Sequence, residues 1–417
     1  MKSSIASLAV CGGEPAFQEK LFVGRPNIGD RERLLDRIGK ILDTKWLSND
    51  GPFVTEFEKR IADLVGVDHC VAMCNATIAL EIAIRALGMA NEVIVPSFTF
   101  IATAHALQWQ EITPVFCDID PATHTLNPDR IAELITPRTT GIIGVHTWGR
   151  PCDVNAINEI ARSRGLKVLY DAAHSFGCSY RGEMIGRFGD AEVFSFHATK
   201  FFNSFEGGAV TTNDATLAAK IRLMKNFGFT NWDEVSYVGT NGKMTEIAAA
   251  MGLTSLEHLD EFINVNRANY ESYKQHLAGT PGVRFLTFDE DNEQHNYQYI
   301  VLEIDKAVTK VGRDELLQVL WAENIIARRY FYPGCHRMEP YRSFFPHSHL
   351  LLPETERVAQ RVLVLPTGTS VNVDEIQQIC QVIKLVISNG KEVSALLQSD
   401  GSGSFSARRL EATARRS

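Results

Sequence analysis

One lysine and one aspartate each follow a hydrophobic stretch that is typical of a buried strand. Lys200 comes after the aromatic run 193–197, and Asp171 closes the apolar run 168–170. A lysine amine can form an imine with pyridoxal 5′-phosphate (PLP), and a carboxylate can hold a proton on the nitrogen of its pyridine ring. Taken alone, the lysine could be an ordinary surface residue, and the aspartate a helix cap or part of a structural ion pair. Together they indicate a PLP site.

Neighbouring residues fit the same chemistry. His174 follows Asp171 by three positions and could contact or stack on a bound ring, although a structural histidine would fit the local pattern as well. Ser195, five positions before Lys200, could donate a hydrogen bond to a phosphate. The glycines at 207 and 208 allow a close backbone approach, because they carry no side chain that would collide with a ligand.

The stretch Asn75-Ala76-Thr77 lies between a predicted strand at 70–73 and a predicted helix at 77–87. Backbone N–H groups at a helix N-terminus form a ready site for a phosphate, and the threonine hydroxyl adds a donor. Asn and Thr are also favoured as plain helix caps, so the stretch by itself does not decide between the two roles. Alongside the lysine and the aspartate, we interpret it as a phosphate site.

An aromatic residue after the next predicted strand, 92–96, could stack on the pyridine ring. Phe98 and Phe100 are the candidates. They are two positions apart, so in a strand both side chains would lie on the same face. The pattern therefore does not decide which of them belongs to the core.

Size and composition limit the class of protein. The chain has 417 residues, enough for two domains with substantial cores, and its formal net charge of -8 disfavours nucleic acid as the main partner. We find neither an apolar run of the roughly 20 residues that span a bilayer nor a convincing signal-peptide core, so we expect a cytoplasmic protein without a membrane partner. The eight cysteines have no CxxC pair and no zinc spacing, so we expect reduced thiols and no metal site.

Short apolar runs and helical patterns alternate between residues 70 and 240. Predicted strands cover 70–73, 92–96, 114–118, 141–145, 168–171 and 193–196, and predicted helices cover 77–87, 103–109, 128–134 and 154–164. Several strands are apolar throughout, as strands buried on both faces are. The alternation predicts an α/β domain with a mostly parallel sheet, in which ligands bind beyond the carboxyl ends of the strands. Asp171 and the segment leading to Lys200 lie at such ends.

The pattern changes after a long helical stretch at 245–275. Predicted strands at 297–304 and 325–330 and predicted helices at 313–323 and 373–388 indicate a smaller α+β domain. We therefore divide the chain into a large domain (1–262), a small C-terminal domain (263–395) and a disordered tail (396–417). The tail is rich in glycine, serine and arginine, and a solvated end is favoured over an arm that binds nucleic acid or membrane.

Four motifs occur in an order and spacing that resembles the DegT/StrS-type sugar aminotransferases. They are the segments 75–77 (NAT), 96–100 (PSFTF), 171–174 (DAAH) and 195–200 (SFHATK). The resemblance covers nearly the whole chain, from the segment 46–52 (WLSNDGP) to the segment 365–368 (LPTG). It implies the aspartate-aminotransferase fold, which is fold type I of the PLP enzymes.

The resemblance also implies roles for particular residues. Lys200 would bind PLP covalently, Asp171 would pair with the pyridine nitrogen, and His174 would lie near the ring. Phe100, rather than Phe98, takes the position of the family's stacking aromatic residue. The phosphate would be bound by Asn75, Ala76, Thr77 and Ser195.

In this family a loop from a second subunit completes the phosphate site, so the resemblance implies a homodimer with shared active sites. The corresponding loop here is 239–246 (GTNGKMTE). Many relatives have Arg or Asn directly before the methionine, whereas this chain has Lys243, which leaves the roles of Asn241 and Lys243 open.

Within the family, the segments 145–152 (VHTWGRPC), 226–229 (NFGF) and 248–255 (AAAMGLTS) are similar to the C-4 aminotransferases of desosamine formation. This resemblance implies transfer of an amino group from L-glutamate to a nucleotide-linked 4-keto-6-deoxy sugar. We expect dTDP-4-keto-6-deoxy-D-glucose as the substrate, in a deoxysugar pathway of antibiotic biosynthesis. Arg328, Arg329 and Tyr330 are candidate contacts to the diphosphate, although a surface ion pair would explain them as well.

The alternatives are a C-3 keto-sugar aminotransferase, another fold type I PLP enzyme such as an amino-acid lyase, and a regulatory relative that binds PLP without turnover. A few family members are dehydratases that carry histidine in place of the lysine. Lys200 argues against that chemistry.

Overall fold

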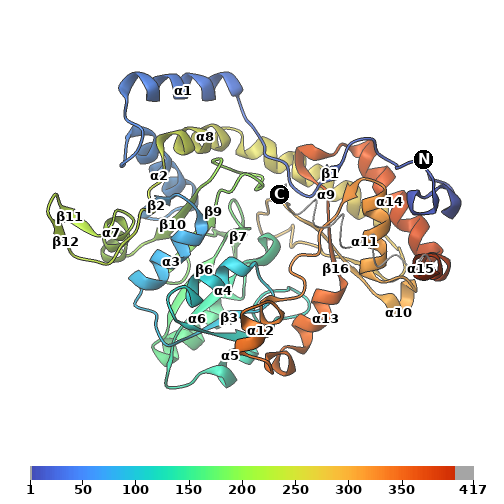
Figure 1. Cartoon of the computed structure of the whole chain (residues 1–417). Coiled ribbons are helices and arrows are strands. Elements are labelled where there is room, and N and C mark those ends of the chain that lie inside the picture. The colour runs from blue at the N-terminus through green and yellow to red at the C-terminus, as the bar shows by residue number, and fades with distance from the viewer. Residues whose placement is uncertain (1, 400–417) are drawn as a thin grey trace.

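The larger part of the protein is built on a seven-stranded sheet with the strand order β2-β10-β9-β6-β5-β3-β4. The structure, a computed structural model, describes residues 2–399 (Figure 1). β10 runs antiparallel to both of its neighbours, and the other pairings are parallel, which confirms the predicted mostly parallel sheet. The strands are β2 (His69–Met73), β3 (Glu92–Pro96), β4 (Thr113–Cys117), β5 (Thr139–Val145), β6 (Lys167–Asp171), β9 (Ala191–Ser195) and β10 (Gly208–Thr212).

Helices cover both faces of this sheet, because successive apolar side chains of each strand point to opposite sides. Val71 packs among α3, α4 and α7, whereas its neighbour Ala72 packs on the opposite face, which α2 and α8 cover. Farther along that opposite face, Ile94 and Ile142 pack against α5 and α6. These helices are α2 (Pro52–Val65), α3 (Ala76–Ala86), α4 (Ile101–Gln108), α5 (Pro128–Leu134), α6 (Val154–Arg164), α7 (Ala215–Met224) and α8 (Glu246–Leu256).

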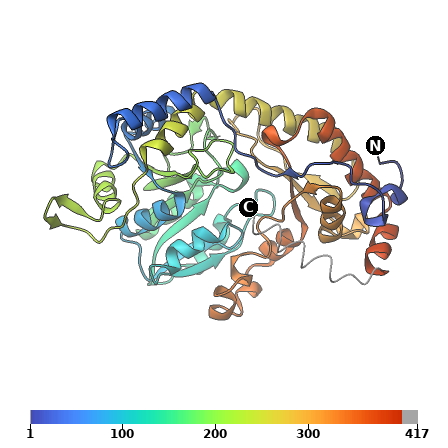
Figure 2. The ribbon, with the colours of Figure 1, turned by 45° about the horizontal axis from the view of Figure 1, so that its top comes forward.

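The smaller part of the protein contains a three-stranded antiparallel sheet and its own core. The sheet has the order β13-β14-β16, formed by β13 (Val283–Phe285), β14 (Ile300–Ile304) and β16 (Val362–Leu365). The long helix α9 (Leu259–Leu277) leads into it from the large sheet, and α11 (Arg313–Ala322) and α14 (Val373–Ser388) enclose its core, as Figure 2 shows from a second direction.

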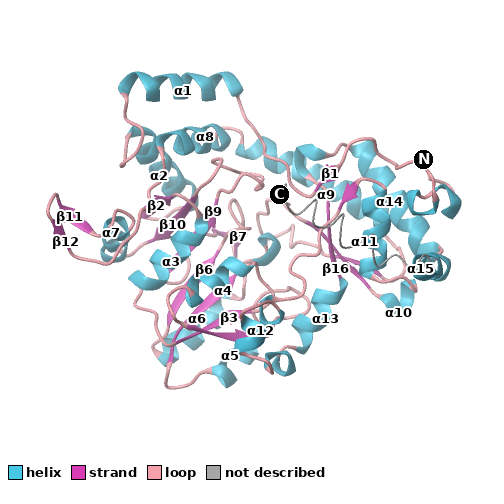
Figure 3. Ribbon diagram, viewed as in Figure 1, coloured by secondary structure: helices cyan, strands magenta, loops and turns pink. Residues whose placement is uncertain are grey.

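The remaining elements are short or peripheral, and Figure 3 shows them in the same view as Figure 1. Helix α1 (Arg31–Thr44) lies on α8 through Leu34 and Ile41. The others are β1 (Leu21–Phe22), β7 (Ser179–Tyr180), β8 (Glu183–Met184), β11 (Phe229–Asn231), β12 (Glu234–Val235), β15 (Ile325–Ile326), α10 (Lys306–Thr309), α12 (Tyr341–Phe344), α13 (Pro353–Arg361) and α15 (Gly390–Ser399). No helix among residues 2–399 combines the length and the apolar composition that crossing a bilayer requires.

The N-terminal segment differs from the predicted domain division. Leu8, Phe17 and Leu21 belong to the core of the smaller part, and β1 pairs in parallel with β15 there, so this segment does not pack with the large domain as expected for residues 1–262. The predicted boundary at 262 falls inside α9, and the predicted start of the tail at 396 falls inside α15. The rest of the predicted tail, 400–417, lies outside the described residues.

Two predicted strands are shorter than expected. The strand predicted at 325–330 ends at Ile326, and Arg328 makes only an isolated bridge to Val364. The strand predicted at 297–304 begins at Ile300. Among the residues left out of the strands, Tyr299 and Tyr330 lie near Lys200 of the large domain. The helical stretch predicted at 245–275 is divided into α8 and α9.

Candidate functional site

The amine of Lys200 lies between the two parts of the protein. Lys200 follows β9, and its Nζ donates a hydrogen bond to the Oη atom of Tyr299, which precedes β14 of the smaller sheet, over 3.2 Å. Burial lowers the pKa of this amine to about 8, although the neighbouring Tyr330 and Asp171 act in the opposite direction. A larger share of the amine is therefore neutral near pH 8 than for an ordinary lysine, as a nucleophile or a base requires.

Asp171 ends β6 and is only 6% exposed. Its Oδ2 accepts a hydrogen bond from Thr103 Oγ1 over 2.8 Å, and its Oδ1 accepts one from the N–H of Ala173 over 3.1 Å. Burial raises the pKa of this carboxyl group, and the two hydrogen bonds and the charge of Lys200 offset only part of that rise. A cationic ring nitrogen beside this carboxylate would relieve the penalty of burial.

His174 lies beside the lysine and is held in a stack of aromatic rings. Its Nδ1 accepts a hydrogen bond from the backbone N–H of Trp148 over 3.3 Å, and its ring stacks on Trp148 and on Phe331. Tyr299 contacts it with a centroid separation of 4.5 Å. Burial lowers the pKa of His174 well below its usual value, so the ring is neutral at physiological pH.

The start of α3 forms the predicted phosphate cradle. Asn75 is the N-cap, and its Oδ1 accepts from the N–H of Ile78 over 2.9 Å. The N–H groups of Ala76 and Thr77 in the first turn have no partners within the helix. A Cβ atom added at Gly208 would lie 2.7 Å from the nitrogen of Ala76, so β10 can approach the helix this closely only with a glycine.

Ser195 ends β9 directly opposite Gly208 and is half-buried. The cradle therefore meets the requirements of a phosphate, with free N–H groups at a helix N-terminus and a hydroxyl on the adjacent strand. Together with the enclosed carboxylate of Asp171 and the amine of Lys200, the residues present fit PLP. Asn75, Ala76, Thr77 and Ser195 would hold its phosphate.

The two phenylalanines after β3 have different environments. Phe98 is fully buried among Trp148, His124 and Phe331, so it belongs to the core. Phe100 is exposed and is the N-cap residue of α4. The strand ends at Pro96, so the alternation that would point both rings the same way does not extend to them. A stacking role for Phe100 stays a prediction.

The loop 239–246 contacts its own chain next to the cradle. The carbonyl oxygen of Gly242 accepts from the N–H of Cys74 over 2.8 Å. Lys243 Nζ donates to Asn226 Oδ1 over 2.9 Å and lies 4.7 Å from the ring centroid of Phe227, while Asn241 is exposed. Among residues 2–399, no contact of the Asn241 or Lys243 side chain with the cradle occurs, so their role across a dimer stays a prediction.

The two candidate arginines for the diphosphate differ in their partners. Arg329 pairs with Asp314 over 3.0 Å and stacks on Tyr332, so it has a structural partner. The guanidinium of Arg328 lies 5.3 Å from the ring centroid of Tyr330 and forms no ion pair within the described part of the chain. All three candidates line one cleft, together with Phe100, Ile101, Trp321, Ile326, Tyr332 and Met338.

Several residues that contact the predicted groups were not identified from the sequence. Thr103 binds Asp171, Tyr299 binds the lysine, and Trp148 and Phe331 support His174. Thr103 and Tyr299 lay inside a predicted helix and a predicted strand, where only periodicity was visible. No group of three or more His, Cys, Asp or Glu side chains that could hold a metal ion occurs among residues 2–399.

The lowered pKa of Lys200 predicts its pattern of chemical modification. In the PLP-free protein, trace acetylation by acetic anhydride should reach half of its maximum near pH 8 at Lys200, since only the neutral amine reacts. An ordinary lysine reaches this point near a pH of about 10.4. Peptide mass spectrometry measures the acetylation of Lys200 and of the exposed Lys59, the internal control, in one sample. A midpoint above pH 10 at Lys200 would contradict the enclosed position of the amine.

Comparison with known proteins agrees with this geometry. Residues 29–384 match the DegT/DnrJ/EryC1/StrS aminotransferase family. A dTDP-4-amino-4,6-dideoxy-D-glucose transaminase from Shigella dysenteriae is 38% identical over 369 residues, which cover 88% of this chain and 99% of the relative. A GDP-perosamine synthase from Caulobacter vibrioides is 38% identical over 77% of this chain and 87% of its own length.

A crystal structure of DesI in the presence of its TDP-sugar product is also similar to this chain. It is 50% identical, superposes with a TM-score of 0.91, and the alignment covers 95% of this chain and 100% of DesI. The fold is therefore that of the fold type I aminotransferases, as the motifs implied. The chain belongs to the DegT/DnrJ/EryC1/StrS aminotransferase family, whose members are PLP-dependent transferases that act on nucleotide sugars.

Proposed function

We propose that this enzyme transfers an amino group from L-glutamate to C-4 of dTDP-4-keto-6-deoxy-D-glucose and forms the 4-amino-4,6-dideoxy sugar. The observation that carries the transfer chemistry is the pairing of a partly neutral Lys200 amine with the enclosed carboxylate of Asp171. The likeness to a relative crystallised with its TDP-sugar product supports the nucleotide. The deoxysugar pathway, the cytoplasmic location and a homodimer with shared sites belong to the same proposal.

Bound PLP supplies an electron sink that makes the α-proton of an amino acid acidic. Asp171 would keep a proton on the ring nitrogen, because its carboxylate is more stable beside a cation than alone in the interior. The Nζ atom of Lys200 would take the proton from the α-carbon of glutamate and return one at C-4 of the sugar. Tyr299 holds this amine in place through its hydroxyl group.

The cleft beside Tyr330 would bind the nucleotide. Tyr330 lies close enough to Lys200 to influence its pKa, and it also lines the cleft that contains Arg328. An unpaired guanidinium suits a diphosphate, and the aromatic side chains of Trp321 and Tyr332 offer flat surfaces for a base. The keto carbon of a sugar attached to that diphosphate would then point toward the lysine.

The covalent role of Lys200 has a direct spectroscopic test. After addition of PLP, the wild-type protein should show a visible absorbance band that free PLP lacks, and borohydride should fix PLP on the peptide that contains Lys200. Lys200→Ala should lose both signals because it has no amine at that position. Lys167→Ala, which removes an exposed lysine that pairs with Asp190, is the matched control and should keep both. Covalent PLP in Lys200→Ala would exclude the assignment.

Product analysis tests the substrate. Incubation of the enzyme with PLP, L-glutamate and dTDP-4-keto-6-deoxy-D-glucose should give a sugar whose NMR spectrum places the new amine at C-4. A GDP-linked 4-keto-6-deoxy sugar should react more slowly by about tenfold or more, since one lost hydrogen bond costs up to about 1.5 kcal/mol. An amine at C-3, or turnover of the GDP-linked sugar alone, would overturn the proposal. Lys200→Ala serves as the inactive control.

Arg328 should contribute to binding of the nucleotide sugar. Because hydrogen bonds to charged groups contribute about 1.5–3 kcal/mol, Arg328→Ala should raise KM for the sugar by roughly 10–100-fold while kcat and KM for glutamate change little. Arg361→Ala is the matched control, since Arg361 pairs with Asp305 and does not line the cleft. Steady-state kinetics with each substrate varied in turn separates these effects. Equal losses in both variants would show that the cleft does not bind the diphosphate.

A further inference from the structure

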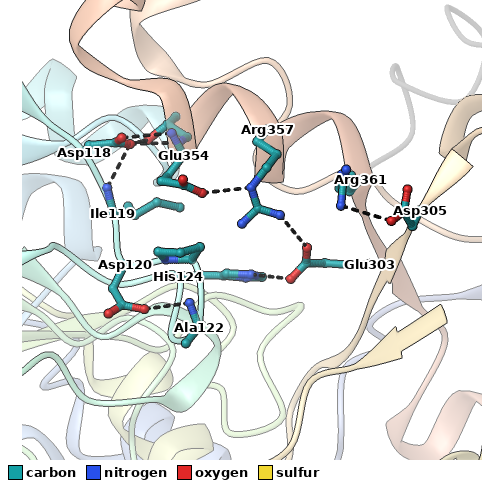
Figure 4. Close-up of polar contacts among 12 residues, drawn as sticks. Asp118, Ile119, Asp120, Ala122, His124, Glu303, Asp305, Glu354, Arg357 and Arg361 are labelled. Atoms are coloured by element: carbon teal, nitrogen blue, oxygen red, sulfur yellow. Dashed lines mark hydrogen bonds and ion pairs between the residues drawn. The ribbon is translucent and has the colours of Figure 1, made fainter. Parts of the chain in front are cut away.

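His124 connects the two parts of the protein beneath the candidate site. It lies in the loop between β4 and α5, is fully buried, and has a φ of 63°, a left-handed conformation that few residues other than glycine adopt. Its Nδ1 lies 3.1 Å from Nε1 of Trp148, and its Nε2 lies 3.0 Å from Oε1 of Glu303 on β14. Figure 4 shows the contact of His124 with Glu303 and the arginine beside it.

The hydrogen bonds of His124 determine where its proton lies. An indole Nε1 is a donor only, so Nδ1 of His124 must accept and carries no proton. The single proton of the neutral ring is therefore on Nε2, from which it is donated to Glu303. Burial lowers the pKa of His124, although its bond to Glu303 acts in the opposite direction.

Glu303 is a fixed, ionised acceptor for that proton. Burial alone would raise its pKa, but His124, Arg284 and Arg357 outweigh this effect, and the pKa is lowered. Arg284 contacts Oε1 over 2.7 Å, and Arg357 lies 3.7 Å from Oε2. Because both arginines and Glu303 lie on elements of the smaller sheet and its helices, the orientation of His124 depends on how the two domains are joined.

Trp148 contacts both His124 and His174. Trp148 also has a left-handed backbone, with a φ of 66°, and its side chain is fully buried. Its indole stacks on the His174 ring with a centroid separation of 6.0 Å, and its backbone N–H donates to Nδ1 of His174. Nδ1 of His174 is thus also unprotonated, and the proton of that ring is on Nε2.

We propose that His124 is a positioning residue of the active site, which acts through the indole of Trp148 to fix the place and the Nε2-protonated form of His174. The inference rests on the proposed function in one respect: His174 is the ring expected beside the bound cofactor. His124 itself touches neither cofactor nor substrate. Glu303 holds it from the other domain, so the protonation form of His174 requires the two domains to be correctly joined.

Two substitutions of His124 separate positioning from simple packing. His124→Leu removes both hydrogen bonds. His124→Asn keeps an acceptor near the position of Nδ1 and tolerates a left-handed backbone, so it should retain the bond from the Trp148 indole. Both lose the bond to Glu303. Because leucine is less favourable than asparagine in a left-handed backbone, the thermal stability of each variant is measured as well, and the lost indole bond is tested separately with Trp148→Phe.

The first measurement uses the PLP-free protein labelled with 15N-histidine. Long-range 1H–15N spectra distinguish the two tautomers of each ring, and His174→Gln identifies the His174 signal. We expect the Nε2-protonated form for His174 in the wild type and in His124→Asn, and a mixture of forms in His124→Leu. The second measurement is the visible band of bound PLP, which should shift in His124→Leu and stay close to that of the wild type in His124→Asn.

The turnover number should decrease from the wild type through His124→Asn to His124→Leu. We expect kcat to fall by about tenfold in His124→Leu, a loss of the size seen when the hydrogen-bond partners of metal-binding histidines are removed, with partial recovery in His124→Asn. The His174 signal and the PLP band require no sugar substrate, so they test the inference even if the proposed amination fails.

If His124→Leu does not fold, Trp148→Phe tests the same inference. It keeps an aromatic ring against His174 but removes the indole donor, and it should reproduce the changes of the PLP band and the His174 signal. In the double variant, the effects of His124→Leu and Trp148→Phe should not add, because both break the same bond. Wild-type spectra in folded His124→Leu and Trp148→Phe, or equal changes in His124→Leu and His124→Asn, would overturn the inference.

Discussion

An enclosed carboxylate at the end of a parallel strand is unfavourable unless donors or a cation accompany it. Asp171 receives one hydrogen bond from Thr103 on α4 and one from the turn that follows β6, and both hold its oxygens in fixed positions. The amine of Lys200 is enclosed as well, and the two groups disturb each other's pKa in the favourable sense. The site therefore holds two ionisable groups whose ordinary charges are destabilised by burial, and a bound pyridine ring that bears a proton would stabilise one of them.

The architecture that encloses these groups depends on contacts between the two domains. Tyr299 of the smaller part binds Lys200, and Phe331 stacks on His174. The joint is strengthened below the site, where Asp118 at the end of the β4 segment accepts from the N–H groups of Glu354 and Thr355 at the start of α13 (Figure 4). A carboxylate at a helix N-terminus is a favourable arrangement, so this contact fixes α13 and the strand β16 that follows it.

One residue at the contact between the two domains also borders the cleft proposed to bind the nucleotide. Tyr330 borders both the lysine and the cleft that contains Arg328, so a ligand in that cleft would lie beside the lysine amine. The relatives act on sugars attached to different nucleotides, although their transfer chemistry is common to the family. Under the proposed function, the cleft residues would select the nucleotide and the residues at the strand ends of the large sheet would carry out the transfer.

The sequence alone indicated six of the seven strands of the larger sheet, because most of them are short apolar runs that end at a turn or a helix start. The seventh strand, β10, was not predicted, since its sequence GAVTT lacks a continuous apolar run. The sequence also indicated Lys200, Asp171 and the Asn75–Thr77 cradle, since they follow β9, β6 and β2, which run in the same direction and end at one edge of the sheet. The motifs of the family added the roles of His174 and Phe100, which periodicity could not assign.

Only the tertiary structure decided which residues from distant segments meet these groups. Phe98 and Phe100 differ in burial because the strand ends before them, and the N-terminal segment joins the smaller core although it precedes the large domain in the chain. Tyr299 and Glu303 lie on or next to a strand whose alternation predicts burial but not a partner. Their contacts with Lys200 and His124 span 99 and 179 positions. No local pattern encodes such pairs, because they arise from how the two domains pack.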